Sequence, residues 1–323
     1  MLVRQRQVPA AGIETRANDL LTEIATRHYL QGQSQVAIAR TLGLDPSTVS
    51  RSLKRAREEG IVHIEIRAPR REELDLGRGL ATRYGLGRVV VAPNEGDLED
   101  GLSPIAAEFV EGLLRSGLRL GISWGNTLAG IVRHLRPGTV AELTIAQLAG
   151  GVDDPTPGIQ GHELARRLVE LYPDSRVHYL HAPAIVASDA AREVFLADRT
   201  VRAALEAARR CELALVGIGQ VDERSTLFRG GHVSGGDWAR LRDAGAVGNM
   251  NTRFFDRLGR PVGELERRTI AIAWGELRAI PTVVAIAAGL DKTRAIAGAL
   301  RTGAVDMLVT DELTARAILE TEV

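Results

Sequence analysis

The sequence is poor in cysteine and lysine: its 323 residues include one cysteine, Cys211, and two lysines, Lys54 and Lys292. A lone cysteine cannot form a disulfide within the chain, which fits a reducing cytoplasm. No apolar run reaches about 18 residues, and the N-terminus lacks the hydrophobic region of a signal peptide. We therefore expect a cytoplasmic protein that neither spans a membrane nor is exported.

The chain also lacks an excess of charge of one sign, since Lys+Arg and Asp+Glu both total 41. Any contact with nucleic acid must then come from a local basic patch. Nucleotide-binding motifs are absent as well: there is no GxxxxGK[ST] sequence, and Gly217-Ile218-Gly219 is not followed by the rest of a GxGxxG fingerprint. We expect no ATP or dinucleotide site, no cofactor and no bound metal.

What the chain does contain is a pair of short helical patterns between Ser34 and Lys54. Ser34 is a suitable N-cap for the first, which carries Val36, Ala39 and Leu42 at helical spacing and ends at Gly43. Asp45 is a good N-cap for the second, and Pro46 suits its first position, where a missing N–H costs nothing. The pattern predicts two helices joined by a tight break.

The second predicted helix has two chemically different faces. Val49, Leu53 and Ala56 fall on one side, and a polar and basic group falls on the other. Hydroxyls and arginines near the N-terminal end of a helix can reach base edges and phosphates. An ordinary αα-hairpin with a solvated basic face is the alternative. The residues that we expect to contact DNA are Gln35, Ser47, Thr48, Ser50, Arg51, Lys54 and Arg55.

The flanks of this pair favour a DNA-binding module. Upstream, Leu20, Leu21, Ile24, Ala25 and Leu30 predict a supporting amphipathic helix, and downstream residues 61–66 predict a short strand or wing. We expect a mobile tail over residues 1–17, a winged helix-turn-helix domain over 18–68 and a second domain over 69–323. A length of 323 residues with 45% hydrophobic composition suits about two domains.

From Arg88 onward, short β-rich runs alternate with helical patterns. Such alternation indicates right-handed βαβ crossovers and an α/β domain of three layers with a mainly parallel sheet. The expected strands are 89–92, 118–122, 143–148, 177–180, 213–218, 269–273, 283–287 and 307–309. In such sheets ligands bind outside the carboxyl ends of the strands.

Two strand-to-helix loops suit an anion. In residues 121–127, Gly125 permits a tight backbone, Ser123, Asn126 and Thr127 add polar groups, and the helix N-terminus offers free N–H donors. In residues 287–292, Lys292 follows Gly289 in a first helical turn, where the macrodipole disfavours a cation unless something negative is present. Both loops have a plain alternative, in which Asn126, Ser123 or Asp291 acts only as a helix cap.

A third polar stretch runs from Gly248 to Asp256. Sugars require many hydrogen bonds, so Asn249 and Asn251 are candidate readers of hydroxyl groups. Gln147, Gly150 and Gly151, at the end of another strand, are candidates to join them. Asp256 is a weaker candidate, because it equally suits a turn.

Together these segments resemble the SorC-type sugar-binding transcriptional regulators of bacteria. The resemblance runs from about Asn18 to Leu319 and rests on Gln35–Lys54, GISWGNT at 121–127, AVGNMNTRFFD at 246–256 and the segment 277–319. It implies a DNA-binding domain, an effector domain related in fold to sugar-phosphate isomerases such as glucosamine-phosphate deaminase, and a dimer or tetramer. It also places phosphate binding on Ser123–Thr127 and Lys292.

Two positions depart from the family pattern. The chain has Ala288 where a second glycine often precedes the lysine loop, and Asn249 where a carboxylate is frequent. Taken over all the loops described above, the candidate effector-binding residues are Ser123, Trp124, Gly125, Asn126, Thr127, Gln147, Gly150, Gly151, Asn249, Asn251, Asp256, Gly289 and Lys292.

The function expected from these observations is a transcriptional regulator of a carbohydrate catabolism operon. Its partners would be a double-stranded operator, a sugar or sugar-phosphate effector and further copies of the chain. The alternative is a sugar-phosphate isomerase or deaminase with a helical appendage. Isomerisation needs a positioned general base, which Asn249 cannot be. Asp256 and His232 lie in no recognisable acid/base pair, so we expect no catalytic residue.

Overall fold

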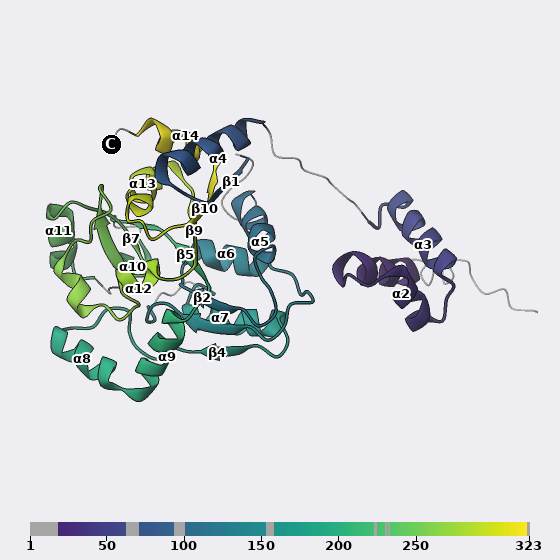
Figure 1. Cartoon of the computed structure of the whole chain (residues 1–323), viewed down its shortest axis with the longest axis horizontal. Coiled ribbons are helices and arrows are strands. Elements are labelled where there is room, and N and C mark those ends of the chain that lie inside the picture. Colours follow the sequence, from purple (N-terminus) through teal and green to yellow (C-terminus); the bar gives the residue numbers. More distant parts are fainter. Residues whose placement is uncertain are drawn as a thin grey trace, which may run out of the picture. The chain divides into compact units, whose positions relative to one another are not determined.

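The computed structural model describes residues 19–62, 71–93, 101–152, 158–222, 225–229, 231 and 233–321 (Figure 1). The chain divides into two compact units between Ala68 and Pro69. The expected tail, residues 1–17, lies outside the described residues, and so does the expected wing from His63 onward. None of the described helices is both long enough and apolar enough to cross a membrane.

The first unit contains three consecutive helical segments. Residues 19–25 are helical and continue into the π-helical turn η1 (Thr26–Leu30), which is followed by α2 (Gln35–Leu42) and α3 (Pro46–Glu58). As predicted, the Ser34 hydroxyl caps α2 by accepting a hydrogen bond from the N–H of Ala37, and Gly43 ends it with a φ of 65°. Asp45 occupies the N-cap position of α3, but its side chain makes no capping hydrogen bond.

The core of this unit differs slightly from the predicted pattern. Val49, Leu53 and Ala56 of α3 are buried as expected, and they pack with Ile24 and Ile38. Ile38 takes the place expected for Val36, which is 57% exposed, and Leu30 is 62% exposed. The π-helical turn shifts the register of the last residues of the first helix, so a regular 3.6-residue period placed Leu30 on the wrong face.

The second unit is built on a parallel sheet of seven strands, as the alternation of patterns predicted. The strand order is β1-β10-β9-β5-β2-β3-β4, and each neighbouring pair is parallel. The strands are β1 (Arg88–Ala92), β2 (Arg119–Ile122), β3 (Thr144–Gln147), β4 (Arg176–His178), β5 (Leu213–Gly217), β9 (Thr282–Ile286) and β10 (Met307–Asp311).

Helices cover both faces of this sheet, which gives the three predicted layers. Because side chains alternate along a strand, Leu213 and Leu215 of β5 enter one core, and Ala214 and Val216 enter the other. The first core is completed by α5 (Ser103–Glu111), α6 (Asn126–His134) and α7 (Gly161–Leu171). The second is completed by α4 (Arg71–Tyr84), α9 (Arg199–Arg209), α13 (Thr293–Arg301) and α14 (Glu312–Glu320).

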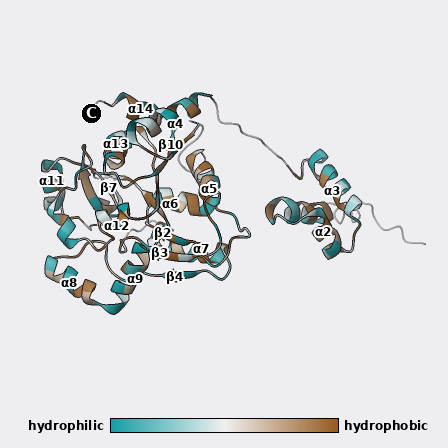
Figure 2. Cartoon of the chain, in the orientation of Figure 1, coloured by the Kyte–Doolittle hydropathy of each residue, from teal (hydrophilic) through white to brown (hydrophobic). Residues whose placement is uncertain are grey.

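A smaller antiparallel sheet adjoins the large one. It consists of β6 (Gly219–Gln220), β7 (Ala246–Met250) and β8 (Arg253–Asp256). Five further short elements are α8 (Asp189–Ala197), α10 (Thr226–Arg229), α11 (Gly235–Asp243), η3 (Glu264–Arg268) and α12 (Trp274–Arg278). Surface helices such as α8 carry both hydrophobic and hydrophilic residues (Figure 2).

The expected strand at 269–273 is wrong. Residues 269–273 form only isolated antiparallel bridges, Ala149 with Ala271 and Ile185 with Thr269, and do not join a sheet. The sequence predicts a strand here because the segment is apolar. Its backbone is held instead by contacts from both sides, including Gly150 N–H to the Ile270 carbonyl at 2.9 Å.

Cys211 lies two residues before β5, in the second core. Its Sγ contacts the Ala207 carbonyl oxygen at 3.6 Å, and a Cβ on Gly121 would lie 3.3 Å from that sulfur. Burial raises the pKa of the thiol to about 12, against a lowering by Arg119. Cys211 therefore fills space as a small apolar side chain.

Candidate functional site

A cavity of about 150 Å³ opens at the carboxyl edge of the large sheet. It lies between the neighbouring strands β2 and β5, where the strand order changes direction. From β2 the sheet continues to β3 and β4, and from β5 it continues the other way to β9 and β10. Such switch points are where open α/β sheets bind ligands. The lining residues are Ser123, Trp124, Gly125, Asn126, Thr127, Leu128, Gly217, Ile218, Gly219, Gln220, Ser225, Thr226, Leu227, Asn249, Asn251, Thr252 and Lys292.

One wall of the cavity is the N-terminus of α6. Gly125, with a φ of 120°, is its N-cap, and no described side chain makes a capping hydrogen bond there. The loop is held by backbone bonds at its base, from Ser123 N–H to Leu215 and from Gly125 N–H to Ile159. The first-turn N–H groups of a helix have no partners within the helix and carry partial positive charge. This wall is therefore able to bind an anion.

Lys292 lines the same cavity from the end of β9. It closes the short 3₁₀ turn η4 (Leu290–Lys292), whose N-cap is Gly289 with a φ of 113°. The lysine is half-buried, and burial lowers the pKa of its ammonium group, against the raising effect of Asp291 and Asp222. A partly desolvated ammonium interacts more strongly with an anion than one in water does.

The hairpin between β7 and β8 supplies the amides. Met250 pairs with Arg253, so the turn consists of Asn251 and Thr252, with φ angles of 51° and 60°. Asn251 is only 4% exposed, and neither its Oδ1 nor its Nδ2 has a hydrogen-bond partner among the described residues. Asn249 packs over β6, because a Cβ on Gly219 would lie 2.6 Å from its Nδ2.

The structure thus brings together eight of the thirteen candidate effector residues. These are Ser123, Trp124, Gly125, Asn126, Thr127, Asn249, Asn251 and Lys292, and all of them line the cavity. They come from β2–α6, β7–β8 and β9–α13, which are distant in sequence. The parallel sheet makes them neighbours, since β2 and β9 both lie next to β5 and end at the same edge.

Five candidate residues do not line the cavity. The Gln147 Oε1 accepts a hydrogen bond from Leu180 N–H at 2.7 Å. Gly150 leaves no space for a side chain, since a Cβ would lie 2.5 Å from the Pro183 carbonyl oxygen, and Gly151 exchanges backbone bonds with Ala182 and Ala184.

The remaining two of those five hold loops. Asp256 closes its own turn: its carboxylate accepts hydrogen bonds from the N–H groups of Leu258 and Arg260 and pairs with the Arg260 guanidinium. Burial raises the pKa of Asp256, but these bonds outweigh it and hold that pKa below its ordinary value. Gly289 donates its N–H to Asp311 and Thr314, which positions the lysine loop behind the cavity wall.

The sequence analysis missed part of the lining, namely Leu128, Gly217–Gln220, Ser225–Leu227 and Thr252. Gly217–Gln220 directly follows β5, so the rule that parallel strands present ligands at their carboxyl ends applies to it equally. Its glycines were considered only as a dinucleotide motif. Ser225–Leu227 carries no comparable signal in the sequence. His232, considered as a base, lies outside the described residues.

The candidate DNA-contacting residues lie on α2 and α3. Ser47, Ser50, Arg51, Lys54 and Arg55 are exposed, and Gln35 and Thr48 are half-buried. The Arg51 side chain lies back along its own helix, with Nε 3.3 Å from the Ser47 carbonyl oxygen and Nη2 3.4 Å from the Thr48 hydroxyl.

Lys54 and Arg55 form exposed ion pairs one turn further on, with Glu58 at 3.7 Å and Glu59 at 2.6 Å. Such exposed pairs contribute only about 0–1 kcal/mol, so phosphate groups can replace the glutamates at little cost. The face opposite to Val49, Leu53 and Ala56 is therefore chemically suited to nucleic acid.

Comparison with known proteins gives the chain a family. Residues 69–320 match the family described as "Putative sugar-binding domain", and residues 22–56 match a helix-turn-helix domain. The transcriptional regulator LsrR of Klebsiella pneumoniae is 32% identical over 96% of this chain and 95% of its own length. The deoxyribonucleoside regulator of Bacillus subtilis is 30% identical over 95% of this chain and 99% of its own length.

A solved structure agrees with these matches. The full-length sorbitol operon regulator SorC from Klebsiella pneumoniae superimposes with a TM-score of 0.76 and 28% identity, covering 94% of this chain and 98% of that chain. The relatives thus match both the helix-turn-helix region and the α/β domain over nearly their whole lengths. The chain belongs to the SorC-type family of sugar-binding transcriptional regulators, whose members join a helix-turn-helix domain for DNA to a domain for a small-molecule effector.

Proposed function

We propose that the cavity between β2 and β5 binds a small sugar phosphate, and that this effector sets the affinity of the helix-turn-helix domain for its operator. The single observation that carries this proposal is that the uncapped N-terminus of α6 and the half-buried Lys292 line one cavity. Two groups of positive character facing the same space favour an anion, and the amides beside them suit hydroxyl groups.

The size of the cavity limits the ligand. Its volume of about 150 Å³ is small beside the roughly 300–1,000 Å³ of pockets that hold drug-sized ligands. A monosaccharide phosphate fits this scale better than an oligosaccharide or a dinucleotide does. We assign residues 69–323 to this effector domain and residues 18–68 to the DNA-binding domain.

Regulation, rather than catalysis, is the proposed role of the cavity. As far as the structure describes the chain, the cavity lining contains no Asp, Glu or His. Isomerisation of a sugar phosphate needs such a group beside the carbonyl carbon or its neighbour. Asp256, the candidate base that the structure describes, is engaged with Arg260 outside the lining. We place the protein in the cytoplasm, where it reaches chromosomal DNA.

The proposal is tested by titration calorimetry of Lys292→Ala with a panel of pentose, hexose and polyol phosphates. Loss of one charge-assisted contact should weaken binding roughly ten- to a hundredfold, which corresponds to about 1.5–3 kcal/mol. Arg294→Ala is the matched control, because Arg294 is an exposed cation two residues away that does not line the cavity. Lys292→Arg should restore binding only in part, since a planar guanidinium does not replace a compact ammonium.

Two readouts separate the possible results. In a gel retardation assay with the protein's own promoter, Lys292→Ala should bind DNA normally and fail to respond to the sugar phosphate, because an effector acts only through its different affinities for two states. An unchanged Kd for Lys292→Ala would overturn the phosphate assignment. An unphosphorylated sugar or polyol held by Asn249 and Asn251 would then be the effector class.

A further inference from the structure

The cavity contains an unusual concentration of polar atoms without partners. Among the described residues, four buried side-chain atoms that belong to lining residues have no hydrogen bond: Trp124 Nε1, Gln220 Oε1, Asn251 Oδ1 and Asn251 Nδ2. Buried polar groups are nearly always hydrogen-bonded, because an unpaired one is destabilising. The ligand that fills the cavity is therefore expected to satisfy these atoms.

These four atoms specify the chemistry of their partner. Trp124 Nε1 and Asn251 Nδ2 are donors, and Gln220 Oε1 and Asn251 Oδ1 are acceptors. A phosphate has many acceptors and few protons to donate, so it matches only half of this set. A hydroxyl group both donates and accepts, and it matches all of it. This part of the lining is thus distinct in character from the α6 N-terminus and Lys292.

Asn251 is the member of this set that the fold holds most firmly. It is 4% exposed, and it occupies the first position of a two-residue turn with a positive φ at both positions. Asn is well suited to that conformation, whereas a β-branched residue such as Thr252 is strained in it. Thr252 is nevertheless buried, and its hydroxyl donates to the Asn251 carbonyl oxygen.

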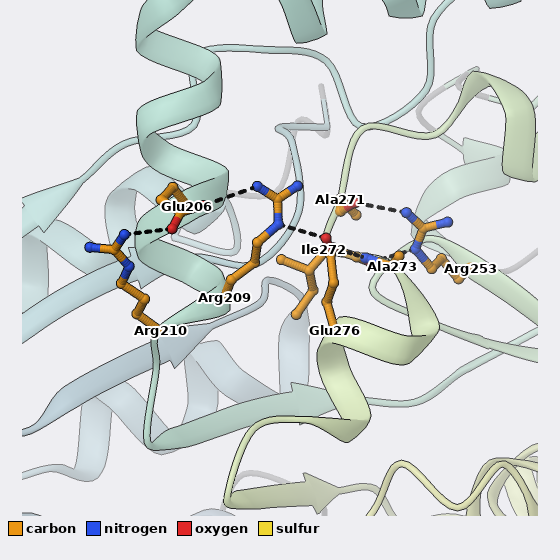
Figure 3. A network of polar contacts seen from close by, with 8 residues as sticks. All are labelled: Glu206, Arg209, Arg210, Arg253, Ala271, Ile272, Ala273 and Glu276. Atoms are coloured by element: carbon orange, nitrogen blue, oxygen red, sulfur yellow. Dashed lines mark hydrogen bonds and ion pairs between the residues drawn. The ribbon is translucent and has the colours of Figure 1, made fainter.

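The next residue, Arg253, anchors the turn from behind. Its side chain is 3% exposed and pairs with Glu266. Its guanidinium donates to the carbonyl oxygens of Ala271 and Ile272 (Figure 3). Ala273, which follows Ile272 in the chain, donates its backbone N–H to the Glu276 carboxylate. Glu276 in turn pairs with Arg209 of α9 at 2.6 Å (Figure 3). The carboxamide of Asn251 thus stands on a turn tied to the main domain and is pre-oriented for its ligand.

We infer that the Asn251 carboxamide binds two neighbouring hydroxyl groups of the effector, so that the protein responds to a sugar with an intact vicinal diol and rejects the deoxy counterpart. The two atoms of one planar amide, a donor and an acceptor side by side, match two adjacent hydroxyls that each donate and accept. Removal of one hydroxyl leaves a buried amide atom unpaired, and sites of this kind reject such analogues strongly. This inference rests on the proposed function, because it takes the cavity to be the effector site.

The experiment compares Kd values of the full-length protein for matched sugars. The probes are ribose 5-phosphate, glucose 6-phosphate, their 2-deoxy and 3-deoxy analogues, and the same sugars without phosphate. Wild-type protein should bind at least one hydroxylated probe about tenfold or more tightly than its deoxy partner. Asn251→Gly removes the carboxamide but introduces a residue that tolerates the φ of 51°, and it should bring that ratio close to one.

A second variant makes the assignment independent of side-chain size. Asn251→Asp keeps the shape and offers two acceptor oxygens, which two adjacent hydroxyls can satisfy by donating, so it should keep a ratio well above that of Asn251→Gly while melting at a similar temperature. Equal Kd values for each pair in wild type, or an unchanged ratio in Asn251→Gly, would overturn the inference.

The panel also separates this inference from the proposed function. If the sugars without phosphate bind as tightly as the phosphorylated ones and the deoxy analogues are rejected, the phosphate assignment fails and the role of Asn251 stands. If phosphorylated sugars bind with dependence on Lys292 but without regard to the deoxy position, the opposite holds. Binding of no probe would overturn both.

Discussion

The backbone N–H of Gly289 donates a hydrogen bond to the carboxylate of Asp311, with 3.0 Å between N and Oδ2. Asp311 is also the N-cap of α14, where it accepts hydrogen bonds from the N–H and hydroxyl of Thr314. One carboxylate thus fixes both the start of α14 and the loop that carries Lys292. The lysine is positioned by a residue that does not itself line the cavity.

Replacement of Asp311 should therefore affect stability and binding together. We expect Asp311→Ala to lower the free energy of unfolding by about 1–2 kcal/mol through loss of the N-cap, and to weaken sugar-phosphate binding. Asp311→Asn retains one acceptor oxygen and should lose less of both. Urea unfolding and calorimetry on the same samples measure the two effects. Unchanged affinity in a destabilised Asp311→Ala protein would contradict the positioning role.

Two residues on α3 should differ in kind when they are removed. Arg51→Ala should cost about 1–3 kcal/mol on the operator and relax sequence preference, because Arg51 lies beside Ser47 and Thr48 near the start of the helix. Lys54→Ala should weaken binding to all sequences alike and reduce the salt slope by about one. Fluorescence anisotropy with operator and random DNA at several salt concentrations measures both. Equal losses on the two DNAs for Arg51→Ala would exclude base reading.

Gly219 gives a test of the cavity that removes no polar group. A Cβ there would lie 2.6 Å from Asn249 Nδ2, so Gly219→Ala should displace the Asn249 amide and reduce effector affinity. Because the close atom is the far end of a side chain, the stability cost should stay within about 1–3 kcal/mol. Gly235→Ala is the control, since a Cβ at Gly235 meets nothing within 4 Å. Equal effector affinity in the two variants would exclude Asn249 from the site.

Acid sensitivity should depend on Asp237. Burial raises the pKa of this carboxyl, but ion pairs with Arg268 and Arg240 and a bond from Ser234 outweigh it and lower the pKa from 3.8 to about 2. The folded state then binds fewer protons than the unfolded state between these values. The resulting stabilisation, about 2 kcal/mol, is fully present above pH 3.8 and is lost as the pH falls towards 2. Asp237→Asn should be less stable than wild type at neutral pH, and the gap in melting temperature should shrink in acid.

The protein should be an even-numbered oligomer. A single helix-turn-helix domain gives a small interface, so specificity should come from two domains on a pseudo-palindromic site with half-sites about 10–10.5 base pairs apart, or a multiple of that. Sedimentation velocity and footprinting measure the two quantities. A monomer at micromolar concentration with full operator affinity would contradict this expectation.

Much of the fold can be predicted from the sequence, because strands that are covered on both faces must be apolar throughout. Residues 213–217 and 282–286 are such runs, and both are central strands. The same rule misled at 269–273, where an apolar extended segment pairs with loops. The helix α11 was not predicted, because its first two residues, Gly235 and Gly236, have low helix propensity.

The candidate site was predictable where a local rule applies and not where three-dimensional neighbours decide. The loops after β2 and β9 were identified from polar residues at strand ends, and both reach the cavity. Gln147 also ends a strand, but its amide is used by Leu180, a contact that no spacing in the sequence reveals. The part played by Gly217–Gln220 depends on β5 lying next to β2, which the sequence order alone does not state.

The burial of Cys211 has a consequence for experiments on this protein. A thiol with a pKa of about 12 holds almost no thiolate at neutral pH, and alkylating reagents attack the thiolate. Since the sequence contains no other cysteine, each labelling event reports a moment at which the start of β5 has opened to solvent. The native chain thus carries its own single-site probe of opening at the amino end of β5, the strand whose other end reaches the cavity, and the labelling rate with and without sugar phosphate measures how far the effector slows that opening.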